Sequence, residues 1–501
     1  ALVLDTSNLV DKTIFKGNNS GTFTVKVGSE LAVSHTTWGK HYILGDGYDL
    51  SGFTDDAWNG DYIKNLTGDD IELAVSKTED GKLMLSAGAG EDPDPNPDPA
   101  PDPDPNPNPQ PDTSIKALSP DFAVPDVIDG LINDEANIGL RDPNSNKMDV
   151  AFIERVLDKN YVGTTADGKL DVKKATRLWN SVVEMSAASA STAYSIGQVS
   201  DTMGMIEDRA AGMDLLAQKK DHLWVKPMGK YSKADKLEGE GSMTGGYEAT
   251  TYGLMLGADA SDENLTLGGA LSYAKGDLKS RGDWTATDTD VELYGINAYG
   301  AVRQGKAAFI GHVGYAQSKG EAKQNFSDVR GNGYSVKSDI KNKMITAGLR
   351  GEIRFDVTDS VVVTPHLGIR YVKTKTDGYD ITMNGKQAFK AGKADGDLWQ
   401  MPLGVSVKAD LWEGAWKLAP YADISVVRQF GDMDMTTSVS ATSYAASDSY
   451  RFDVAGKTMG ELKLGLSAEK KNHTFGLSYT GSVGTQGSQT HSVTASYSYR
   501  F

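Results

Sequence analysis

The last ten residues of the chain alternate strictly between apolar and polar side chains. The apolar members, Val493, Ala495, Tyr497, Tyr499 and Phe501, would share one face of an extended strand. A tilted strand of about 9–11 residues is long enough to cross a bilayer. A strand in a soluble β-sandwich could carry the same alternation, so this segment by itself leaves both kinds of protein open.

The same alternation recurs in about twelve segments of residues 223–501. The clearest are Thr251–Ala258, Leu265–Tyr273, Ile345–Phe355, Val361–Tyr371, Trp399–Val407, Leu418–Val426, Leu462–Leu466, Phe475–Tyr479 and the terminal strand. Less regular strands are expected at Leu223–Tyr231, Val291–Val302 and Phe309–Tyr315, with one or two bulged positions. Twelve is an even number, as a closed bacterial barrel with both ends on the same side requires.

The polar faces of these segments separate a membrane barrel from a soluble sandwich. In the segment 361–371 that face carries His366 and Arg370, and in the segment 399–407 Lys408 continues it. A soluble core would not accept these side chains, whereas a water-filled lumen would. The pattern therefore predicts an all-β dominated fold, a 12-stranded antiparallel transmembrane β-barrel.

The number of strands also limits the width of the lumen. Barrels of about eight strands are filled by their own side chains, and barrels of about sixteen to eighteen strands leave an open channel. About twelve strands should therefore leave a lumen of intermediate width. One α-helix of about 10–12 Å diameter would fit in it.

Residues 113–222, which precede the barrel, carry helical patterns around Met148–Leu157 and from about 172 to 216. The middle of the second pattern, residues 185–193, consists mostly of Ala and Ser and has no wide apolar stripe. It would pack poorly in a globular core but could thread a polar tube. At about 1.5 Å per residue, some thirty residues span the height of the wall. We therefore expect the helix of residues 180–209 to plug the barrel.

The charged end of this helix is Glu207-Asp208-Arg209. We expect these three side chains to meet lumen charges, among them Arg350 and Arg370. Such contacts would form in a partly dry space, where losing one partner costs more than at a surface.

Residues 1–89 hold short β-like runs such as Thr22–Val27 and Ile71–Val75, separated by Gly, Asn and Asp turns. This spacing suits either a sandwich or the end of a β-solenoid. In the linker that follows, residues 90–112, every second residue from Pro93 to Pro111 is proline, which predicts a polyproline-II rod of about 60 Å. Acidic rather than basic neighbours favour a spacer over a ligand for aromatic-lined grooves.

The amino-acid composition limits the range of cellular compartments and binding partners that the chain can have. The mean hydropathy is −0.40 and no apolar run approaches about eighteen residues, so we expect no membrane-spanning helix. The formal charge of −17 argues against nucleic acid or an anionic lipid surface as partner. The absence of cysteine excludes disulfides, thiol catalysis and thiolate metal sites. The first residues show no basic segment, so we expect a signal peptide and further N-terminal protein to have been removed.

No set of residues predicts an enzyme or a metal site. The seven histidines form no i,i+4 pair, and the spacing of His35 and His41 favours a surface pair over a metal site. Aspartates within residues 46–56 lie in a Gly-rich stretch that no calcium-binding loop follows. Gly456–Thr458 is similar to the end of a phosphate-binding loop, but Arg451 stands where a glycine is needed, which favours a turn. We therefore expect no catalytic residues, no cofactor and no metal.

Several stretches carry a family resemblance. Leu223–Gly229, Gly245–Tyr247 and Tyr252–Asp259 look like the first hairpin of a monomeric, type V autotransporter, and Leu267–Tyr273 looks like its third strand. Glu184–Arg209 is similar to the linker helix of that family. The resemblance covers residues from about 150 to 501 well and the first 110 only by position.

The resemblance implies a translocator in the bacterial outer membrane, which lets an N-terminal passenger reach the cell surface and then holds the linker helix in its lumen. Residues 1–89 would be the C-terminal end of that passenger, displayed or released. The terminal Tyr497, Tyr499 and Phe501 are similar to the signal that barrel-assembly machinery recognises in its clients. The implied partners are outer-membrane lipid, this machinery, periplasmic chaperones and the passenger itself, with a monomeric barrel and no nucleic acid.

Some members of that family cut themselves in the lumen through an asparagine pair in the linker helix. Here the helix has Asn180 but no such pair, so we do not expect self-cleavage by that route.

Other functions stay open. A barrel enzyme, such as a lipase or protease, would need a Ser/His or carboxylate/His set at one rim, whereas His312, His366 and His473 lie inside alternating strands. A passive porin would have no reason to carry a proline rod and an extra helix upstream. For the passenger, an adhesive or sugar-binding surface on the aromatic residues of 1–89 is the alternative to a purely structural role for them.

Overall fold

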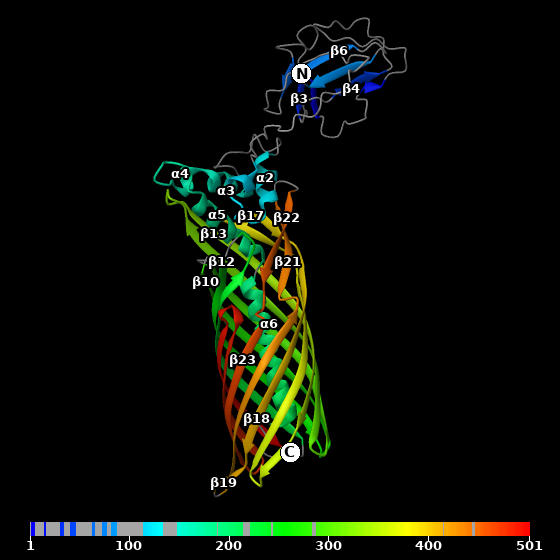
Figure 1. Cartoon of the computed structure of the whole chain (residues 1–501), viewed down its shortest axis with the longest axis vertical. Helices are drawn as coiled ribbons and strands as arrows, with labels where there is room; N and C mark the ends of the chain where they lie inside the picture. The colour runs from blue at the N-terminus through cyan, green and yellow to red at the C-terminus, as the bar shows by residue number, and fades with distance from the viewer. Residues whose placement is uncertain are drawn as a thin grey trace, which may run out of the picture. The chain divides into compact units, whose positions relative to one another are not determined.

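The computed structural model describes residues 2–5, 15–16, 31–34, 41–46, 63–65, 73–77, 82–87, 114–133, 148–187, 189–213, 221–241, 244–282, 287–413, 415–442 and 446–501. These residues belong to two compact units, Ala1–Pro111 and Asp112–Phe501 (Figure 1).

The described strands of the first unit form two small sheets in which parallel pairing recurs. β1, β3 and β5 pair in parallel, and the residues Leu2, Leu31 and Ile63 lie side by side across them. β2 and β4 are also parallel, whereas β7 pairs antiparallel with both β4 and β6. The bounds are β1 Leu2–Asp5, β2 Phe15–Lys16, β3 Leu31–Ser34, β4 His41–Asp46, β5 Ile63–Asn65, β6 Leu73–Lys77 and β7 Leu83–Ala87.

In a β-solenoid, the strands of successive coils stack on one another in parallel. The parallel pairs therefore favour the solenoid alternative over the sandwich. The side chains of Leu31, Val33 and Leu85 are buried and belong to the hydrophobic core of this unit. The expected run Thr22–Val27 lies outside the described residues.

The second unit is a closed antiparallel barrel with twelve successive strand positions in its described residues. In order they are β8 His222–Glu238, β9 Thr244–Ser261, β10 Leu265–Gly282, β11 Thr287–Gln304, β12 Ala307–Ser327, β13 Gly333–Ile353 with β14 Phe355–Thr358, β15 Val361–Thr376 with β16 Tyr379–Met383, β17 Lys386–Ala391 with β18 Ala394–Ala409 and β19 Leu411–Glu413, β20 Trp416–Gly431 with β21 Asp434–Ala441, β22 Ser447–Asp453 with β23 Thr458–Lys470, β24 His473–Gly484 and β25 Gln489–Arg500. β25 pairs with β8 and closes the wall. Every segment that the alternation indicated falls on one of these strands, and the predicted 12-stranded barrel is confirmed.

The strands extend beyond the segments that the alternation indicated. The alternation did not reveal the additional residues, because the apolar side chains change from the outward to the inward face partway along a strand. On β13, Ile345 and Leu349 point outward and are 56% and 65% exposed, but nearer the start of the strand Val336 and Ile340 point inward and are buried. The outward positions there are charged, as at Lys341. This reversal lies where lipid outside the wall gives way to water, and where a packed interior replaces a polar lumen.

The two ends of the barrel differ in their connections. At one end the turns are short, such as residues 262–264 between β9 and β10 and residues 471–472 between β23 and β24. The wall begins and ends here, since the backbone N–H of Phe501 donates to the carbonyl of Asp221 over 3.0 Å. Short turns and barrel termini mark the periplasmic end of such barrels. The opposite end, which β16, β17, β21 and β22 extend, is therefore extracellular.

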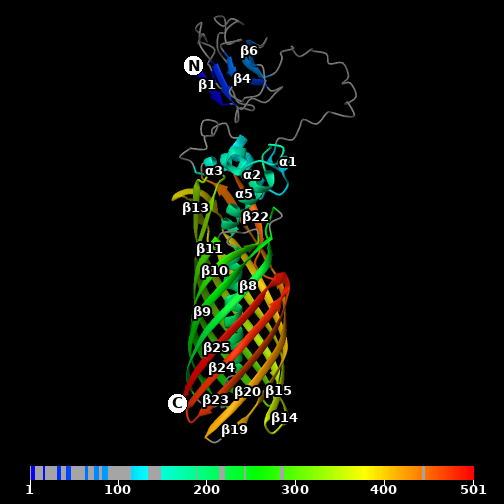
Figure 2. The ribbon, with the colours of Figure 1, turned by 90° about the vertical axis from the view of Figure 1, so that its left-hand side faces the viewer.

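Six α-helices in the described residues precede the barrel: α1 Ile115–Leu118, α2 Pro125–Asn133, α3 Met148–Leu157, α4 Lys159–Val162, α5 Val172–Ala187 and α6 Ser189–Ala211. Both views show α1 to α5 gathered at the extracellular end and α6 running inside the barrel (Figures 1 and 2). Phe152 of α3 and Trp179 of α5 pack on Phe389 of β17, with ring centroids 6.4 Å and 5.5 Å from it. None of the helices in the described part of the chain is long and apolar enough to cross a membrane.

The expected helix of residues 172–216 consists of two helices, and the part inside the barrel is α6 rather than residues 180–209. The reason lies in the residue types. α5 carries the large apolar side chains of Trp179 and Val182, which are buried in the core at the extracellular end. α6 begins with small residues, which a lumen of limited width accepts.

Candidate functional site

The candidate site is the contact between α6 and the lumen wall. Its upper half makes contacts between hydroxyl groups: the hydroxyl of Ser195 lies 2.9 Å from that of Ser318 on β12, and the hydroxyl of Tyr194 lies 3.1 Å from that of Thr251 on β9. The wall makes room with glycine, because a Cβ atom at Gly276 would lie 2.3 Å from the Tyr194 hydroxyl oxygen. At Gly320 it would lie 2.6 Å from Ser191 Oγ. The helix therefore lies directly against the strands.

Hydroxyl groups of α6 are also satisfied by the helix itself. Ser195, Ser200 and Thr202 each donate to the carbonyl four residues earlier, over 2.7, 2.9 and 3.0 Å. Such bonds let small polar residues sit in a buried helix without unpaired groups. This explains how a helix without a wide apolar stripe is stable in the lumen.

The lower half of α6 is held by ion pairs. Glu207 accepts two hydrogen bonds from Arg370, from Nε at 3.0 Å and from Nη2 at 2.6 Å, and it lies 3.1 Å from Nε2 of His312. Asp208 contacts Arg350 over 3.3 Å and also pairs with Lys463. These partners stand on four strands, and the helix is therefore contacted from several sides. The partners are His312 on β12, Arg350 on β13, Arg370 on β15 and Lys463 on β23.

Arg209 completes this set near the periplasmic end. Its Nε and Nη2 donate to Asp259 over 2.8 and 3.2 Å, and its guanidinium lies 5.4 Å from the ring centroid of Trp224. Asp259 also accepts a hydrogen bond from Tyr299 over 2.8 Å and lies 3.3 Å from His222. The side chains of Arg209 and Asp259 are 1% and 2% exposed. Removing one partner of such a buried pair strands the other charge, at a cost of about 3–5 kcal/mol.

Two further contacts hold the middle of the helix. Lys230 of β8 pairs with Asp201 over 2.5 Å, and Gln400 of β18 donates to Ser200 over 2.9 Å. Polar contacts to α6 therefore come from β8, β9, β12, β13, β15, β18 and β23. A helix bound from so many directions has one position and one rotation in the lumen.

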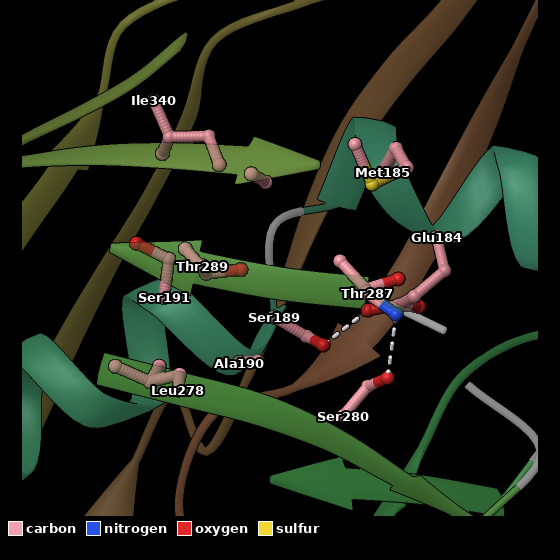
Figure 3. Close-up of a pocket in the computed structure, with 11 residues that line it drawn as sticks. Glu184, Met185, Ser189, Ala190, Ser191, Leu278, Ser280, Thr287, Thr289 and Ile340 are labelled. Atoms are coloured by element: carbon pink, nitrogen blue, oxygen red, sulfur yellow. Dashed lines mark hydrogen bonds between the residues drawn. The ribbon is translucent and has the colours of Figure 1, made fainter. Parts of the chain in front are cut away.

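A second cluster lies where α5 and α6 meet, at the extracellular end (Figure 3). The carboxylate of Glu184 accepts hydrogen bonds from Ser189 and, over 2.8 Å, from Tyr450 on β22. Tyr379 of β16 donates to the carbonyl of Met185 over 2.8 Å. Burial raises the pKa of Glu184 to about 7, because the charged form loses its hydration. These contacts tie the entrance of the lumen helix to the extended strands.

The structure brings together all the lumen residues expected from the sequence, and it adds partners that the sequence analysis did not name. Those partners are Asp259, His312, Lys463 and the pair of Lys230 with Asp201. A signal for the wall residues was present, because each stands on the inward phase of an alternating strand. The sequence did not indicate which charged residue of α6 each of these wall residues would contact.

Two further histidines and the residues similar to a phosphate-binding loop lie on the wall or in its connections. His366 pairs with Asp423 over 2.7 Å inside the wall, whereas His473 lies outward beside Tyr497. Gly456 and Lys457 lie in the connection between β22 and β23, and Thr458 is the first residue of β23. In the described residues no group of three or more His, Asp or Glu side chains is arranged to hold a metal ion.

Other expectations fall outside the described residues. These include His35 and most of the aspartates of residues 46–56. The terminal Tyr497, Tyr499 and Phe501 lie on the outward phase of β25 or directly after it, and Phe501 is 65% exposed.

Comparison with known proteins agrees with this architecture. Residues 223–480, more than half of the chain, match the family described as autotransporter beta-domain. Outer membrane protein B of Rickettsia typhi is 27% identical over 191 residues, which are 34% of this chain and 11% of that protein. Outer membrane protein B of Rickettsia rickettsii is 28% identical over the same shares. The chain thus spans about a tenth of the length of these curated relatives.

Among solved structures, the translocator domain of the autotransporter NalP from Neisseria meningitidis aligns with 15% identity and a TM-score of 0.47, over 62% of this chain and 100% of that one. The transport unit of AIDA-I from Escherichia coli aligns with 15% identity and a TM-score of 0.42, over 61% of this chain and 98% of that one. The family match over residues 223–480 decides the assignment: the chain belongs to the autotransporter beta-domain family, whose barrel lies in the bacterial outer membrane.

Proposed function

We propose that the barrel exports the N-terminal part of its own chain across the outer membrane and enables its display at the cell surface. The path of the chain carries this proposal. α5 lies at the extracellular end, α6 descends through the lumen, and β8 starts the wall at His222 on the periplasmic side. Everything upstream of α6 therefore emerges at the extracellular end of a wall that the same chain builds.

After export α6 would remain as a plug. The ion pairs of Glu207, Asp208 and Arg209 hold it against strands on several sides. A filled lumen fits a translocator at rest better than a passive porin, which needs an open path. We assign no catalytic step to this chain.

The finer organisation is part of the same proposal. Residues 1–89 are the end of the passenger, residues 90–112 a polyproline spacer, residues 113–222 a helical linker with the pore helix, and residues 223–501 the translocator. Outer-membrane lipid and the passenger are the partners in the mature state. Barrel-assembly machinery and periplasmic chaperones act earlier and read Tyr497, Tyr499 and Phe501, whose outward side chains remain available on the strand that closes the barrel.

Single cysteines test the topology, because the chain contains none of its own. Lys116→Cys places a thiol on exposed α1, and Glu263→Cys places one in the short turn between β9 and β10. A membrane-impermeant maleimide should label the Lys116→Cys protein on intact cells and the Glu263→Cys protein only after the outer membrane is permeabilised. The reverse pattern would overturn the proposal, and labelling of both denatured proteins controls for reactivity.

Protease treatment gives a second readout. Protease added to intact cells should remove the first unit and leave a heat-modifiable fragment that contains the barrel. Protection of the first unit until the outer membrane is lysed would count against surface display.

A further inference from the structure

The helix α6 does not fill the lumen evenly. Its backbone lies closer to β11 and β12 than to β24 and β25 on the opposite wall. On the near side, the inward residues Ser318 and Thr346 are 0% and 3% exposed. On the far side, the inward residues of β24 and β25 are half-buried along most of the lumen, and they are Gly476, Ser478, Thr480, Ser492, Thr494 and Ser496. Space that water can enter therefore lies between α6 and these two strands.

The helix carries a matching stripe of accessible residues. Gly197, Asp201, Gly204, Met205 and Asp208 are half-buried, whereas the other residues of α6 that lie between them are buried. Their spacing places them on one face of the helix. A Cβ atom at Gly197 would have no other atom within 4 Å, and the side chain of Asp201 is 36% exposed although it lies inside the barrel.

Two ion pairs show which part of the wall this stripe faces. Asp201 pairs with Lys230 on β8 over 2.5 Å, and Asp208 pairs with Lys463 on β23. β24 and β25 lie between β8 and β23 in the closed wall. The stripe therefore faces the half-buried hydroxyl groups of β24 and β25, and long lysine side chains reach across the space at its two borders.

A small enclosed cavity continues this space toward the periplasm. Asp208 and Glu461 border the cavity, and Arg350, His366 and Asp423 also line it. Two buried atoms in it, Nε of Arg350 and Nδ1 of His366, have no hydrogen-bond partner among the described residues. Buried polar atoms are normally hydrogen-bonded, and in a polar cavity water is the partner that fits. These two atoms therefore indicate that the cavity holds water.

A larger cavity of about 780 Å³ lies beyond it, at the periplasmic end of the described residues. Thr364 of β15 and Ser406 of β18 line this cavity, one inward position further along their strands than His366 and Gly404. Nε2 of His366 lies 2.7 Å from the carboxylate of Asp423 on β20. Gly404 makes room for the ring, because a Cβ atom there would lie 2.7 Å from Cε1 of His366. The pair of His366 and Asp423 therefore separates the two cavities.

We propose that the barrel conducts small inorganic ions while α6 is in place. The ions pass through water along the side of α6 that carries Asp201 and Asp208, and then past the pair of His366 and Asp423 into the periplasmic cavity. Hydroxyl, carboxylate and ammonium groups line this passage and replace part of the hydration of an ion. Because the pair narrows the passage, the current is far smaller than that of a barrel without α6. The passage belongs to the resting state, so its absence would leave the proposed export unaffected.

Single cysteines test the passage, because the chain contains no cysteine of its own. Thr494→Cys places a thiol in the passage, and Thr346→Cys places one at a buried inward position of β13, on the side where α6 lies. In planar bilayers with potassium chloride, a small cationic methanethiosulfonate should reduce the current of the full-length Thr494→Cys protein to about half or less. The reagent should leave the currents of the unsubstituted chain and of the Thr346→Cys protein unchanged.

Mass spectrometry of the same samples should find the thiol of Thr494→Cys modified in the folded protein and that of Thr346→Cys modified only after denaturation. The proposal is overturned if the unsubstituted full chain carries no current. It is also overturned if Thr494→Cys is not modified, or if its modification leaves the current unchanged.

A second experiment separates the passage from movement of the helix. The hydroxyls of Ser195 and Ser318 are 2.9 Å apart, so the double variant Ser195→Cys, Ser318→Cys can form a disulfide that fixes α6 to β12. The oxidised and the reduced protein should carry the same current. A current that disappears on oxidation would come from displacement of α6, and it would refute the passage.

The narrow point has its own test. His366→Ala removes the ring and should raise the current about threefold, since the narrowest part of a pore limits its conductance. His473→Ala removes the same side chain from the outward face of β24 and should leave the current unchanged. Heat-modifiability on gels confirms that both variants are folded. Equal currents of the two variants would contradict the proposed path, and if His366→Ala does not fold, the Thr494→Cys protein decides.

Discussion

Arg209 near the end of α6 and Asp259 near the end of β9 form a two-bonded ion pair from which water is almost completely excluded. The pair joins the last turn of the lumen helix to the wall two residues before β9 ends at Ser261 and the short periplasmic turn begins. The pair therefore holds the C-terminal end of α6 in place.

Arg209→Met should lower stability by about 3–5 kcal/mol, because Asp259 would stay buried without its cation. The double variant Arg209→Met, Asp259→Leu should recover part of this loss. Thermal unfolding of the purified barrel measures both. Arg451→Met is the control, since its pair with Asp434 is largely exposed and should contribute about 1 kcal/mol or less.

Removal of residues 1–213, which includes α6, should leave a barrel that inserts but conducts ions much more strongly in planar bilayers. It should also melt at a lower temperature, because the lumen charges would lose their partners. Removal of residues 1–112 alone serves as the control and should leave conductance low. Equal conductance of the two truncated proteins would show that α6 does not occupy the pore in the membrane.

Phe501→Ser, or deletion of Phe501, should lower the yield of folded barrel in cells, because the terminal aromatic is an outward, apolar anchor beside Tyr499, with ring centroids 5.2 Å apart. Ser492→Thr on the inward phase of β25 is a suitable control. It is better than Ser498→Thr, since the Ser498 hydroxyl lies 3.4 Å from Arg209. Comparable folded yields for Phe501→Ser and Ser492→Thr would contradict the role of the terminal residue.

Stability of the α5–α6 junction should fall as the pH rises from about 4.5 to about 7. The folded state raises the pKa of Glu184 to about 7 from 4.5, so it holds the proton more tightly than the unfolded state. The stabilisation, at most about 3 kcal/mol, is complete below pH 4.5 and lost above pH 7. Hydrogen exchange of residues 184–195 at several pH values measures it, and Glu184→Gln should remove the dependence on pH.

The sequence by itself determined the class of the protein and the course of its wall. A lipid bilayer is uniform along its plane, so every strand that faces it must repeat the same outward apolar pattern, and this pattern is local. The small residues of α6 likewise indicated a helix that fits a narrow, polar space. The terminal alternation lies on β25 from Val493 to Tyr499, as expected, and Phe501 follows directly after the strand.

Only the tertiary structure decided where the strands end and which charges meet. β13 continues beyond the membrane with Val336 and Ile340 turned inward, because helices α3 and α5 supply a core there that no pattern in the strand alone reveals. Glu207 pairs with Arg370, which is 163 positions away in the sequence, and Arg209 pairs with Asp259, which is 50 positions away. Such partners depend on the register and tilt of the closed wall around the helix, so the local alternation that predicts a strand cannot specify them.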